Sequence, residues 1–553
     1  MDLDLPGDSS ITRIIRDRLK ENELYVCFGG GVGSFGKNFT IFYFNDTIIW
    51  LDVGCGFPSQ SLPGLRRIIP PKELIEAFPP DAIIFTHAHE DHVGALPYIC
   101  SEMQSNIPIF SSDFTLAIIK RRLREYKINL DYFAYNPLKK NTKFQVGNFN
   151  IHNFFMPHSI PQTFAVGLEP AGTGRKIFFT SDFKIEGNEE RFNESDIRNF
   201  GPVDFLFCDS TGTLNSGKSI GESIVAENLE SVIKNWRGRI FMTTFASQID
   251  RLIQIHKIAR KYNRRLGIRG QSIISHLDAA LEAKIMDEPF WYNRKPDAED
   301  KQALWLISGC QADEGSSLFR FAEGKLLPLK PEAGDLLVYS ASIIPSNVDQ
   351  VHFVLNKIAR EGVKITGLAD YDLKVHASGH ARMEDIGKMI SWLDPRVLIP
   401  VHGDHIHFMG FPGILGANSP VQFKVLDDNC IYKLNAGITE VMRLPFIPQL
   451  IEEGEIHTEY SLYSHRTNLS RAGICNLIIS EKTKKLEQIQ YIGTASQGFL
   501  KKSIPELSEK IQGLIKKLYD TNGNIRDRKL KQKIGKLNYS ILKKDPYINI
   551  IWI

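Results

Sequence analysis

The sequence predicts an α/β protein with several domains, and three observations support this. The chain has 553 residues, whereas one hydrophobic core rarely serves more than about 300 residues, so we expect two to four domains. Hydrophobic residues make up 42% and charged residues 24% of the chain, which is typical of a globular protein. Between residues 212 and 369, apolar strand-like runs alternate with helical segments, which indicates a parallel sheet.

The first half of the chain is expected to begin with a short polar helix at residues 9–22. Three strands follow between residues 23 and 53, separated by a glycine turn and by the pair Asn45-Asp46. The apolar run 81–87 predicts a buried strand that ends in a histidine-rich loop. Further elements are expected in this order: a strand at 107–112, a helix near 114–126, strands at 144–155, 163–169, 176–182 and 203–208, and a helix near 219–236.

The second half continues the alternation of strands and helices. Expected strands are 239–244, 265–270, 303–308, 335–341, 363–368 and 396–402, with helices at 247–262 and 347–361. The last hundred residues begin as a loop and continue as short strands and a Lys-rich helical region. The domains we expect are an N-terminal extension (1–22), a first domain in two pieces (23–211 and 370–445), an inserted α/β domain (212–369), a linker (446–462) and a small α+β C-terminal domain (463–553).

Composition excludes several classes of protein. The net charge of +3 gives no global attraction to polyanions, so any nucleic-acid contact must come from local patches. Seven cysteines without a CxxC pair indicate reduced thiols rather than a disulfide framework. The acidic start MDLDLPGDSS shows neither a signal peptide nor a transit peptide, and no run of about 18 apolar residues spans a membrane. These features predict a cytoplasmic protein without a membrane partner.

The motif HAHEDH, residues 87–92, predicts half of a two-metal site. On an extended loop His87 and His89 can face one point, and Asp91 and His92 can face a second point nearby. Neutral imidazoles and carboxylates are ligands that Zn²⁺ takes. Other ligands must arrive from strand ends elsewhere in the chain.

Three later residues fit that requirement, because each follows an apolar run. His158 in FMPHSIP would complete the first site, His402 in LIPVHGD would complete the second, and Asp182 in FFTSDFK could bridge both metals. A lone histidine after a strand is usually an ordinary surface residue. Several candidates that follow an HxHxDH motif in this order favour a metal centre instead.

These residues resemble the metallo-β-lactamase fold, in which two mixed sheets lie between helices. The gap of 220 residues from Asp182 to His402 is long for that fold alone, and the inserted α/β domain is similar to that of the β-CASP subgroup, whose members process nucleic acids. GGGVGSFGKN, HAHEDHVGALPYI, PHSIP, TSDFKI, CDST, TFASQIDR, HASGHA and PVHGD further resemble the ribonuclease J family, in the same order. GICNLIIS, SQGFL and DPYINIIWI resemble the C-terminal domain of that family.

The resemblance implies roles for further residues. Asp52 would support the metal loop, and Asp209 and His380 match signature residues of the β-CASP subgroup. Backbone amides and the hydroxyl group in Ser378-Gly379-His380 would hold RNA phosphates, with His380 donating to a phosphate oxygen, while His376 would have either a phosphate-binding or a structural role. The implied catalytic residues are Asp91, Asp182, Asp209 and His380.

The implied activity is that of a di-zinc ribonuclease, with Mg²⁺ or Mn²⁺ as alternative activating ions. It would act as a 5′→3′ exonuclease favouring 5′-monophosphate RNA and as an endonuclease on single-stranded RNA, assembled as a homodimer or homotetramer. Three alternatives remain: a DNA-directed β-CASP nuclease, a small-molecule metallo-hydrolase, which should lack the insert, and a non-catalytic RNA-binding scaffold, which should have lost ligands.

Some stretches leave substrate preference open. Gly212 stands where the family tends to have Asn, Gly270-Gln271-Ser272-Ile273 replaces Gly-Arg-Ser-Met, and residues 308–317 are looser than the family pattern. Basic residues in KRRLRE (120–125) and RKYNRR (260–265), with Arg237 and Arg239, would either line an RNA groove or form solvated helix faces.

Two glycine motifs suggest nucleotide binding but have simpler explanations. GxGxxG at Gly31, Gly33 and Gly36 is followed by a strand-like run rather than a helix, so we expect a tight turn. GTLNSGKS (212–219) matches a P-loop, yet Ser219 and Glu222 are spaced as a capping box for the next helix, which accounts for both without a nucleotide.

Overall fold

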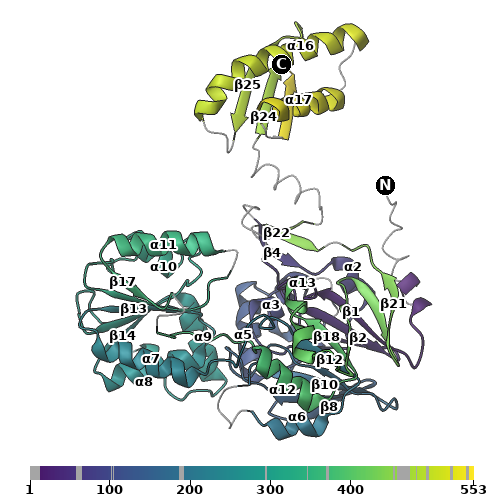
Figure 1. The fold of residues 1–553 in the computed structure, drawn as a ribbon, viewed down its shortest axis with the longest axis vertical. Helices are drawn as coiled ribbons and strands as arrows, with labels where there is room; N and C mark the ends of the chain where they lie inside the picture. The colour runs from purple at the N-terminus through teal and green to yellow at the C-terminus, as the bar shows by residue number, and fades with distance from the viewer. Residues whose placement is uncertain are drawn as a thin grey trace. The chain divides into compact units, whose positions relative to one another are not determined.

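The structure is a computed structural model of the chain, drawn in Figure 1. The residues it describes are 13–15, 17–57, 65–100, 103, 105–185, 192–292, 296–344, 347–368, 373–446, 448–452, 455–457, 474–480, 482–492, 497–522, 527–542 and 547–552. Of the N-terminal helix expected at 9–22, residues 13–15 and 17–18 are helical and residues 19–22 are not, while residues 9–12 and 16 lie outside the described residues. Among the helices described, none has the length and apolar character needed to cross a membrane.

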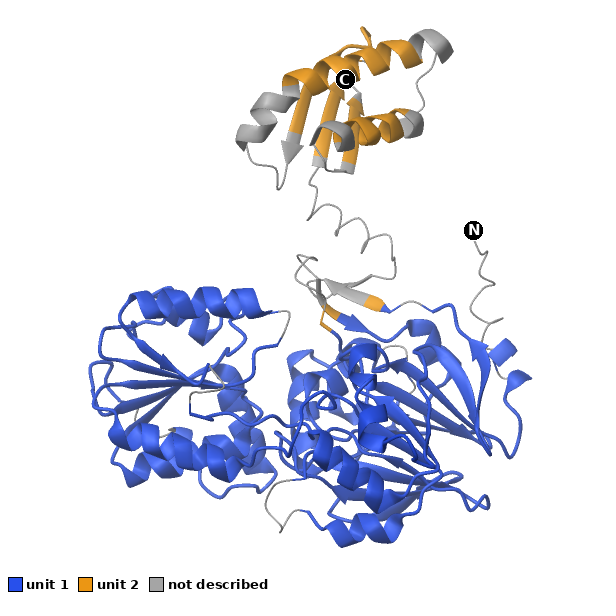
Figure 2. Ribbon diagram, in the orientation of Figure 1, with its two compact units in different colours: residues 1–56, 68–448 blue, residues 57–67, 449–553 orange. Residues whose placement is uncertain are grey.

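The chain forms two compact units, shown in Figure 2. Unit 1 comprises Met1–Gly56 with Ile68–Pro448, and unit 2 comprises Phe57–Arg67 with Gln449–Ile553. The domain boundaries expected from the sequence stay a prediction. The assignment of residues 57–67 to unit 2 was not foreseen, because this short stretch lies between two elements of the first domain in the sequence.

Unit 1 contains an eight-stranded mixed sheet. The pair Asn45-Asp46 forms the expected tight turn between β2 (Phe39–Phe44) and β3 (Thr47–Leu51), with φ values of 45° and 59° that suit a two-residue hairpin. In sheet order the strands are β21 (Ile438–Arg443), β20 (Cys430–Leu434), β1 (Leu24–Gly30), β2 (Phe39–Phe44), β3 (Thr47–Leu51), β5 (Ala82–Ile84), β6 (Ile107–Ser111) and β7 (Phe133–Pro137).

A second sheet of seven strands faces the first. Strands β11, β12 and β18 are parallel, and β9 runs in the same direction because it and β11 both pair antiparallel with β10. In sheet order the strands are β19 (Gln422–Phe423), β18 (Val397–Val401), β12 (Phe205–Asp209), β11 (Ile177–Phe179), β10 (Phe164–Pro170), β9 (Phe149–Phe155) and β8 (Lys143–Val146). The carboxyl ends of β9, β11, β12 and β18 therefore meet at one edge.

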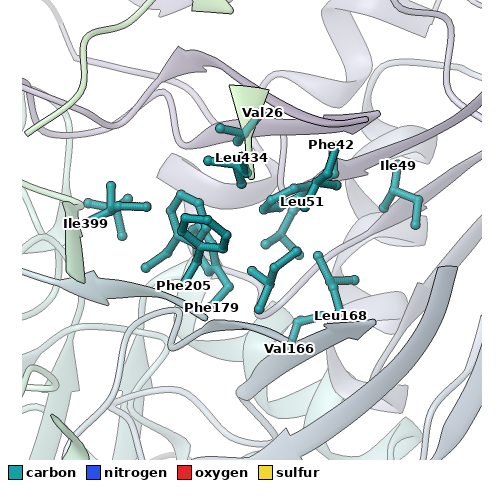
Figure 3. Packing of buried hydrophobic residues seen from close by; sticks show 14 of the residues in the cluster. Val26, Phe42, Ile49, Leu51, Val166, Leu168, Phe179, Phe205, Ile399 and Leu434 are labelled. Carbon is teal, nitrogen blue, oxygen red and sulfur yellow. The ribbon is translucent and has the colours of Figure 1, made fainter. Parts of the chain in front are cut away.

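The two sheets pack face to face over a common hydrophobic core, and Figure 3 shows residues of both sheets meeting there. Val26, Phe42 and Leu51 come from the first sheet, and Phe179 and Phe205 come from the second. Helices α6 (Glu194–Phe200) and α12 (Met383–Leu393) cover the other face of the second sheet. On the first sheet, the residue that follows α2 (Lys72–Ala77) accepts a hydrogen bond from the indole of Trp50. The predicted sandwich of two sheets between helices is confirmed.

The insert forms a separate parallel sheet with helices on both faces (Figure 1). Its strand order is β14 (Arg265–Arg269), β15 (Ala303–Ile307), β13 (Ile240–Thr244), β16 (Leu336–Ser340) and β17 (Lys364–Thr366). One face packs on α7 (Glu222–Asn235), α8 (Ile249–Lys261) and α9 (Gln271–Glu282). The other face packs on α10 (Ser317–Ala322) and α11 (Val348–Arg360). The predicted α/β insert is confirmed; α9 and α10 were not among the expected helices.

Unit 2 contains a sheet of three strands, β25 (Leu486–Ile492), β24 (Ile474–Ile479) and β26 (Tyr547–Trp552). Helices α16 (Gln497–Asn522) and α17 (Asp527–Leu542) pack on this sheet through a core of their own that includes Leu507, Ile511, Leu530 and Ile534. A second three-stranded sheet has the order β23 (Glu455–His457), β22 (Gln449–Glu452) and β4 (Leu65–Ile69). The small α+β C-terminal domain is present as expected.

Both glycine motifs lie in turns. Gly31, Gly33 and Gly36 have φ values of 92°, 76° and 77° in the connection from β1 to β2, so no helix follows them. The predicted capping box is wrong: α7 begins at Glu222 with Gly221 as its N-cap and without a side-chain cap. The Glu222 carboxylate instead accepts hydrogen bonds from Arg251, which keeps it from reaching back to the helix start.

Candidate metal centre

The seven candidate ligands gather at one edge of the sandwich, because each follows a strand that ends there. Residues 87–92 follow β5 and lead into the short helix α3 (Glu90–Val93). His158, Asp182 and His402 follow β9, β11 and β18, whose carboxyl ends meet at this edge. Five of the seven are buried, with relative exposures from 0% at His87 to 8% at His158, whereas His89 and Asp91 are partly exposed.

The first cluster consists of His87, His89 and His158 with Asp182. The Nδ1 atom of His89 lies 3.1 Å from Nε2 of His87 and 3.2 Å from Nε2 of His158. Oδ2 of Asp182 lies 3.5 Å from Nε2 of His87 and 3.7 Å from Nε2 of His158. Four ligand atoms within 4.8 Å of one another can surround a single cation.

The second cluster consists of Asp91, His92 and His402. Oδ2 of Asp91 lies 3.1 Å from Nε2 of His402 and 3.7 Å from Nε2 of His92. Asp182 reaches this cluster as well, because its Oδ1 lies 3.5 Å from Nε2 of His402 and its Oδ2 lies 3.4 Å from Nε2 of His92. Oδ1 of Asp182 is buried without a hydrogen-bond partner among the described residues, as expected of an oxygen that awaits a cation. The donor set therefore fits two ions that share Asp182.

Asp52 holds the ring of His92 from behind. Its Oδ2 lies 2.8 Å from Nδ1 of His92, and its other contacts come from the amide and hydroxyl groups of Thr86, each at 2.8 Å. With Nδ1–H donated to Asp52, Nε2 of His92 carries the lone pair that a cation needs, and Nδ2 of Asn38 lies 3.0 Å from the same nitrogen. Burial raises the pKa of Asp52, and the neighbouring His92 works in the opposite direction.

Three hydroxyl-bearing residues that we did not predict also hold the ligand histidines in place. The hydroxyl group of Thr211 lies 2.8 Å from Nδ1 of His402, and Thr86 contacts Nδ1 of His87 at 3.0 Å. Ser247, in the insert, contacts Nε2 of His89 at 3.2 Å, so that ring turns Nδ1 toward the cluster. Thr211 and Ser247 lie inside two of the motifs named above, CDST and TFASQIDR, and Thr86 directly precedes HAHEDH, which is the signal that could have found them.

Asp209 orients His380 toward the cluster. Nδ1 of His380 lies 2.8 Å from Oδ2 of Asp209, and its Nε2 lies 3.9 Å from Oδ2 of Asp182. Burial lowers the pKa of His380, but Asp209 and Asp182 outweigh it, so the pKa is raised. A protonated His380 would present an N–H donor beside the metal ligands.

The loop before His380 is tied to the first cluster and to the insert. The carbonyl of Gly379 lies 2.7 Å from Nδ1 of His158, and a Cβ at Gly379 would lie 2.6 Å from Cε1 of that ring, so only glycine fits. Nδ1 of His376 accepts a hydrogen bond of 2.8 Å from the guanidinium of Arg251. Since a guanidinium can only donate, the proton of His376 resides on Nε2.

The direction of the pKa shift separates the ligand histidines into two groups. Burial lowers the pKa of His87, His89 and His158, that of His89 to about 4, so these rings are neutral and ready to bind a metal. Burial also lowers the pKa of His402, but Asp182 and Asp91 together raise it to about 9. Because ligands must lose their protons, an ion at the second cluster would displace a proton from it.

Three arginines of the basic stretches pair with groups of the protein itself, and two of these arginines are buried. Arg239, 4% exposed, forms a bidentate pair with Asp335 at 2.8 and 2.7 Å. Arg264, 6% exposed, donates to main-chain carbonyls, including that of Gly238 at 2.8 Å. Arg122 pairs with Glu90 beside the metal loop. These arginines support neighbouring segments rather than an open groove.

Comparison with known proteins identifies the family. Residues 48–230 match the beta-lactamase superfamily domain, residues 237–358 the ribonuclease J beta-CASP domain, and residues 373–411 the Zn-dependent metallo-hydrolase RNA specificity domain. Ribonuclease J of Thermus thermophilus is 34% identical over 424 residues, which cover 73% of each chain. The chain belongs to the ribonuclease J family. It is therefore a metal-dependent ribonuclease, and its substrate is RNA.

Other proteins that resemble the chain in sequence are also ribonuclease J enzymes. Ribonuclease J of Corynebacterium glutamicum is 27% identical over 519 residues, covering 88% of this chain and 70% of the relative. Ribonuclease J of Mycobacterium tuberculosis is 29% identical over 419 residues, covering 73% and 71%. The crystal structure of a protein of unknown function from Enterococcus faecalis V583 has a TM-score of 0.55 at 16% identity, covering 74% of this chain and 100% of that chain, and shows the fold alone.

Gly212, the departure from the family pattern after CDST, has a steric explanation. A Cβ at this position would overlap the carbonyl oxygen of Ala381, two residues after Gly379. A side chain here would push the loop of residues 376–380 away from the metal centre. The absence of a side chain at Gly212 therefore allows the main chain at Ala381 to lie close to it.

Proposed function

We propose that the chain binds two zinc ions and hydrolyses RNA as a 5′→3′ exonuclease that favours 5′-monophosphate ends, with endonuclease action on single strands. The observation that carries this proposal is the position of Asp182, whose two oxygens lie within 3.7 Å of imidazole nitrogens from both clusters. Two ions, when bound, would supply an activated water and clamp the phosphodiester for in-line attack.

The protein groups around the ions orient the substrate. His380, held by Asp209, points Nε2 toward Asp182 and would donate to a phosphate oxygen of the scissile bond. The hydroxyl oxygen of Ser378 accepts from the main-chain N–H of His380 at 3.1 Å, which leaves its own O–H free to donate to a phosphate. The N–H at Nε2 of His376 has no partner among the described residues and would serve as a further phosphate donor.

The alternatives differ in substrate. A DNA-directed enzyme would use the same ions, and discrimination would have to come from contacts to the 2′-hydroxyl. A small-molecule hydrolase would not need residues of the insert, yet Ser247 of the insert contacts the metal-loop residue His89. That contact favours a polymeric substrate held by both domains.

Location and assembly belong to the same proposal. We infer a cytoplasmic protein, supported by seven free cysteines, all of them buried. We also infer a homodimer or homotetramer, on family resemblance. Light scattering coupled to size-exclusion chromatography would give the oligomeric state directly.

The test compares substrates on one purified protein. Matched oligonucleotides would be 5′-monophosphate RNA, 5′-triphosphate RNA and 5′-monophosphate DNA, with zinc content measured by atomic spectroscopy. We expect two zinc ions per chain and rapid release of mononucleotides from monophosphate RNA, lost in Asp182→Ala and retained in Asp313→Ala, an exposed aspartate far from the ligands in sequence. Absence of cleavage of every substrate by the fully zinc-loaded protein would contradict the proposal.

A further inference from the structure

Charge is divided unevenly along the chain. Residues 474–553 contain 16 Lys and Arg and 7 Asp and Glu, a net charge of +9 in 80 residues. Residues 1–473 contain 51 basic and 57 acidic residues, a net charge of −6. The part of the chain that holds the metal centre thus offers a polyanion no net long-range attraction, and the C-terminal segment does.

Helix α17 carries the most basic stretch of this segment. Its sequence, DRKLKQKIGKLNYSIL, has five basic residues and a single acidic one, Asp527, at its first position. Leu530 and Ile534 face the core of unit 2, whereas Lys533 and Lys536 are exposed and lie three residues apart on the outer side. In α16, by contrast, Lys510 pairs with Glu506 four residues earlier, at 2.5 Å.

Three lysines of α17 have no such partner in the described part of the chain. Lys531, Lys533 and Lys536 form no ion pair with any residue that the structure describes. Like charges three or four residues apart destabilise a helix, so α17 contains a charge repulsion that a bound polyanion would remove. An ordinary solvated face would intersperse acidic residues, as α16 does.

We propose that the outer face of α17 in unit 2 binds the RNA backbone, as a second contact for the substrate strand outside the metal centre. The identity of the polyanion rests on the proposed function. A row of lysines recognises phosphates and not bases, so binding through it is independent of sequence and sensitive to salt. Two contacts on one chain make the second binding event intramolecular, so long RNA is held more tightly than short RNA.

The experiment measures binding without turnover, on full-length protein stripped of metal by a chelator. A fluorescent 30-nucleotide single-stranded RNA is titrated at several KCl concentrations with wild type and with the triple variant Lys531→Gln/Lys533→Gln/Lys536→Gln. A matched control, Lys301→Gln/Lys330→Gln/Lys424→Gln, removes the same charge from exposed lysines of unit 1. We expect the α17 variant to bind about tenfold more weakly and to lower the slope of log affinity against log salt by about 2, with the control unchanged.

Equal affinities and slopes for the two triple variants would overturn the proposal. Retained RNA binding with lost binding to anionic phosphatidylserine vesicles would also overturn it and assign the face to a membrane surface. With metal restored, we expect the α17 variant to cleave a tetranucleotide at the wild-type rate and the 30-mer more slowly at 150 mM KCl. Binding is measured without cleavage. If the nuclease proposal failed, a positive binding result would therefore still hold, and only the conclusion that the bound RNA is cleaved would change.

Discussion

At the scale of single residues, the metal centre depends on groups that never touch a metal. His87, His92 and His402 each have one ring nitrogen directed at the cluster and the other held by Thr86, Asp52 or Thr211. These partners fix the tautomer and the ring plane, which sets how well the ligand nitrogen points. Loss of a partner should therefore weaken metal binding without removing any ligand.

The substitution Asp52→Ala tests this directly. We expect zinc affinity at the second cluster to fall about 10–100-fold, because His92 loses the acceptor that orients Nδ1–H. Competition with a chromophoric chelator would measure the affinity, and Asp313→Ala would serve as the exposed control. Unchanged affinity in Asp52→Ala would show that packing alone orients the ring.

A second residue-scale prediction concerns pH. Burial raises the pKa of Asp428 to about 6, and Lys37 at 3.8 Å offsets this in part. Because the folded-state pKa lies above the ordinary value, ionised Asp428 destabilises the fold, and its penalty disappears as the pH falls through 6 toward 4. The stability advantage of Asp428→Asn over wild type should therefore be larger at pH 8 than at pH 4.5 by about 2 kcal/mol.

Thermal unfolding of both proteins across this pH range would check the prediction. The amide of Asn can still accept the hydrogen bond that Asp428 receives from the N–H of Val32, so the comparison isolates the charge. A stability difference that stays constant with pH would contradict it.

At the scale of elements, a buried arginine on α8 joins the insert to the loop that ends in His380. Arg251 is 2% exposed and forms a bidentate pair with Glu222 at 3.1 and 2.7 Å. It also donates to the carbonyl of Ser340 at 2.9 Å and to Nδ1 of His376 at 2.8 Å. One side chain thus couples α7, α8, β16 and the loop of residues 376–380.

The substitution Arg251→Lys keeps the charge but removes the planar fork of donors. We expect a loss of about 2 kcal/mol of stability, since buried acceptors lose their partners, together with a lower kcat because the loop is less well fixed. Arg198→Lys, at an exposed pair with Glu194, should change stability by less than about 0.5 kcal/mol. Chemical denaturation and steady-state kinetics would give both quantities; wild-type kcat in Arg251→Lys would exclude a role in positioning the loop.

Elements were predictable where one pattern dominated. Apolar runs such as 81–87 and 203–208 predicted strands, and the ligands beyond their ends came together as expected. Helix α10 was missed because it has only 6 residues. Helix α9 was missed because it follows a strand without a strong cap signal, since its N-cap residue Gly270 makes no side-chain hydrogen bond. The capping box at Ser219 failed because Arg251, 29 residues after Glu222, binds that carboxylate. Long-range partners of this kind cannot be deduced from local spacing.

At the scale of the whole molecule, the two units have separate hydrophobic cores. The clusters around the sandwich and the insert contain residues of unit 1, whereas Leu507, Ile511 and Ile534 belong to a core confined to unit 2. The seven candidate ligands all belong to unit 1. Stability therefore need not be a single quantity, since a metal can stabilise only the unit that binds it.

This division predicts a selective response to metal removal. In calorimetry we expect two unfolding transitions, of which only the one from unit 1 rises when zinc is added and falls when a chelator removes it, because a ligand stabilises the state it binds by RT ln(1 + [L]/Kd). Asp182→Ala, which removes the carboxylate shared by both clusters, should abolish most of that rise and leave the other transition in place. A single transition that shifts as a whole with zinc would mean that the two units unfold together, and the cores would then be thermodynamically coupled despite their separate composition.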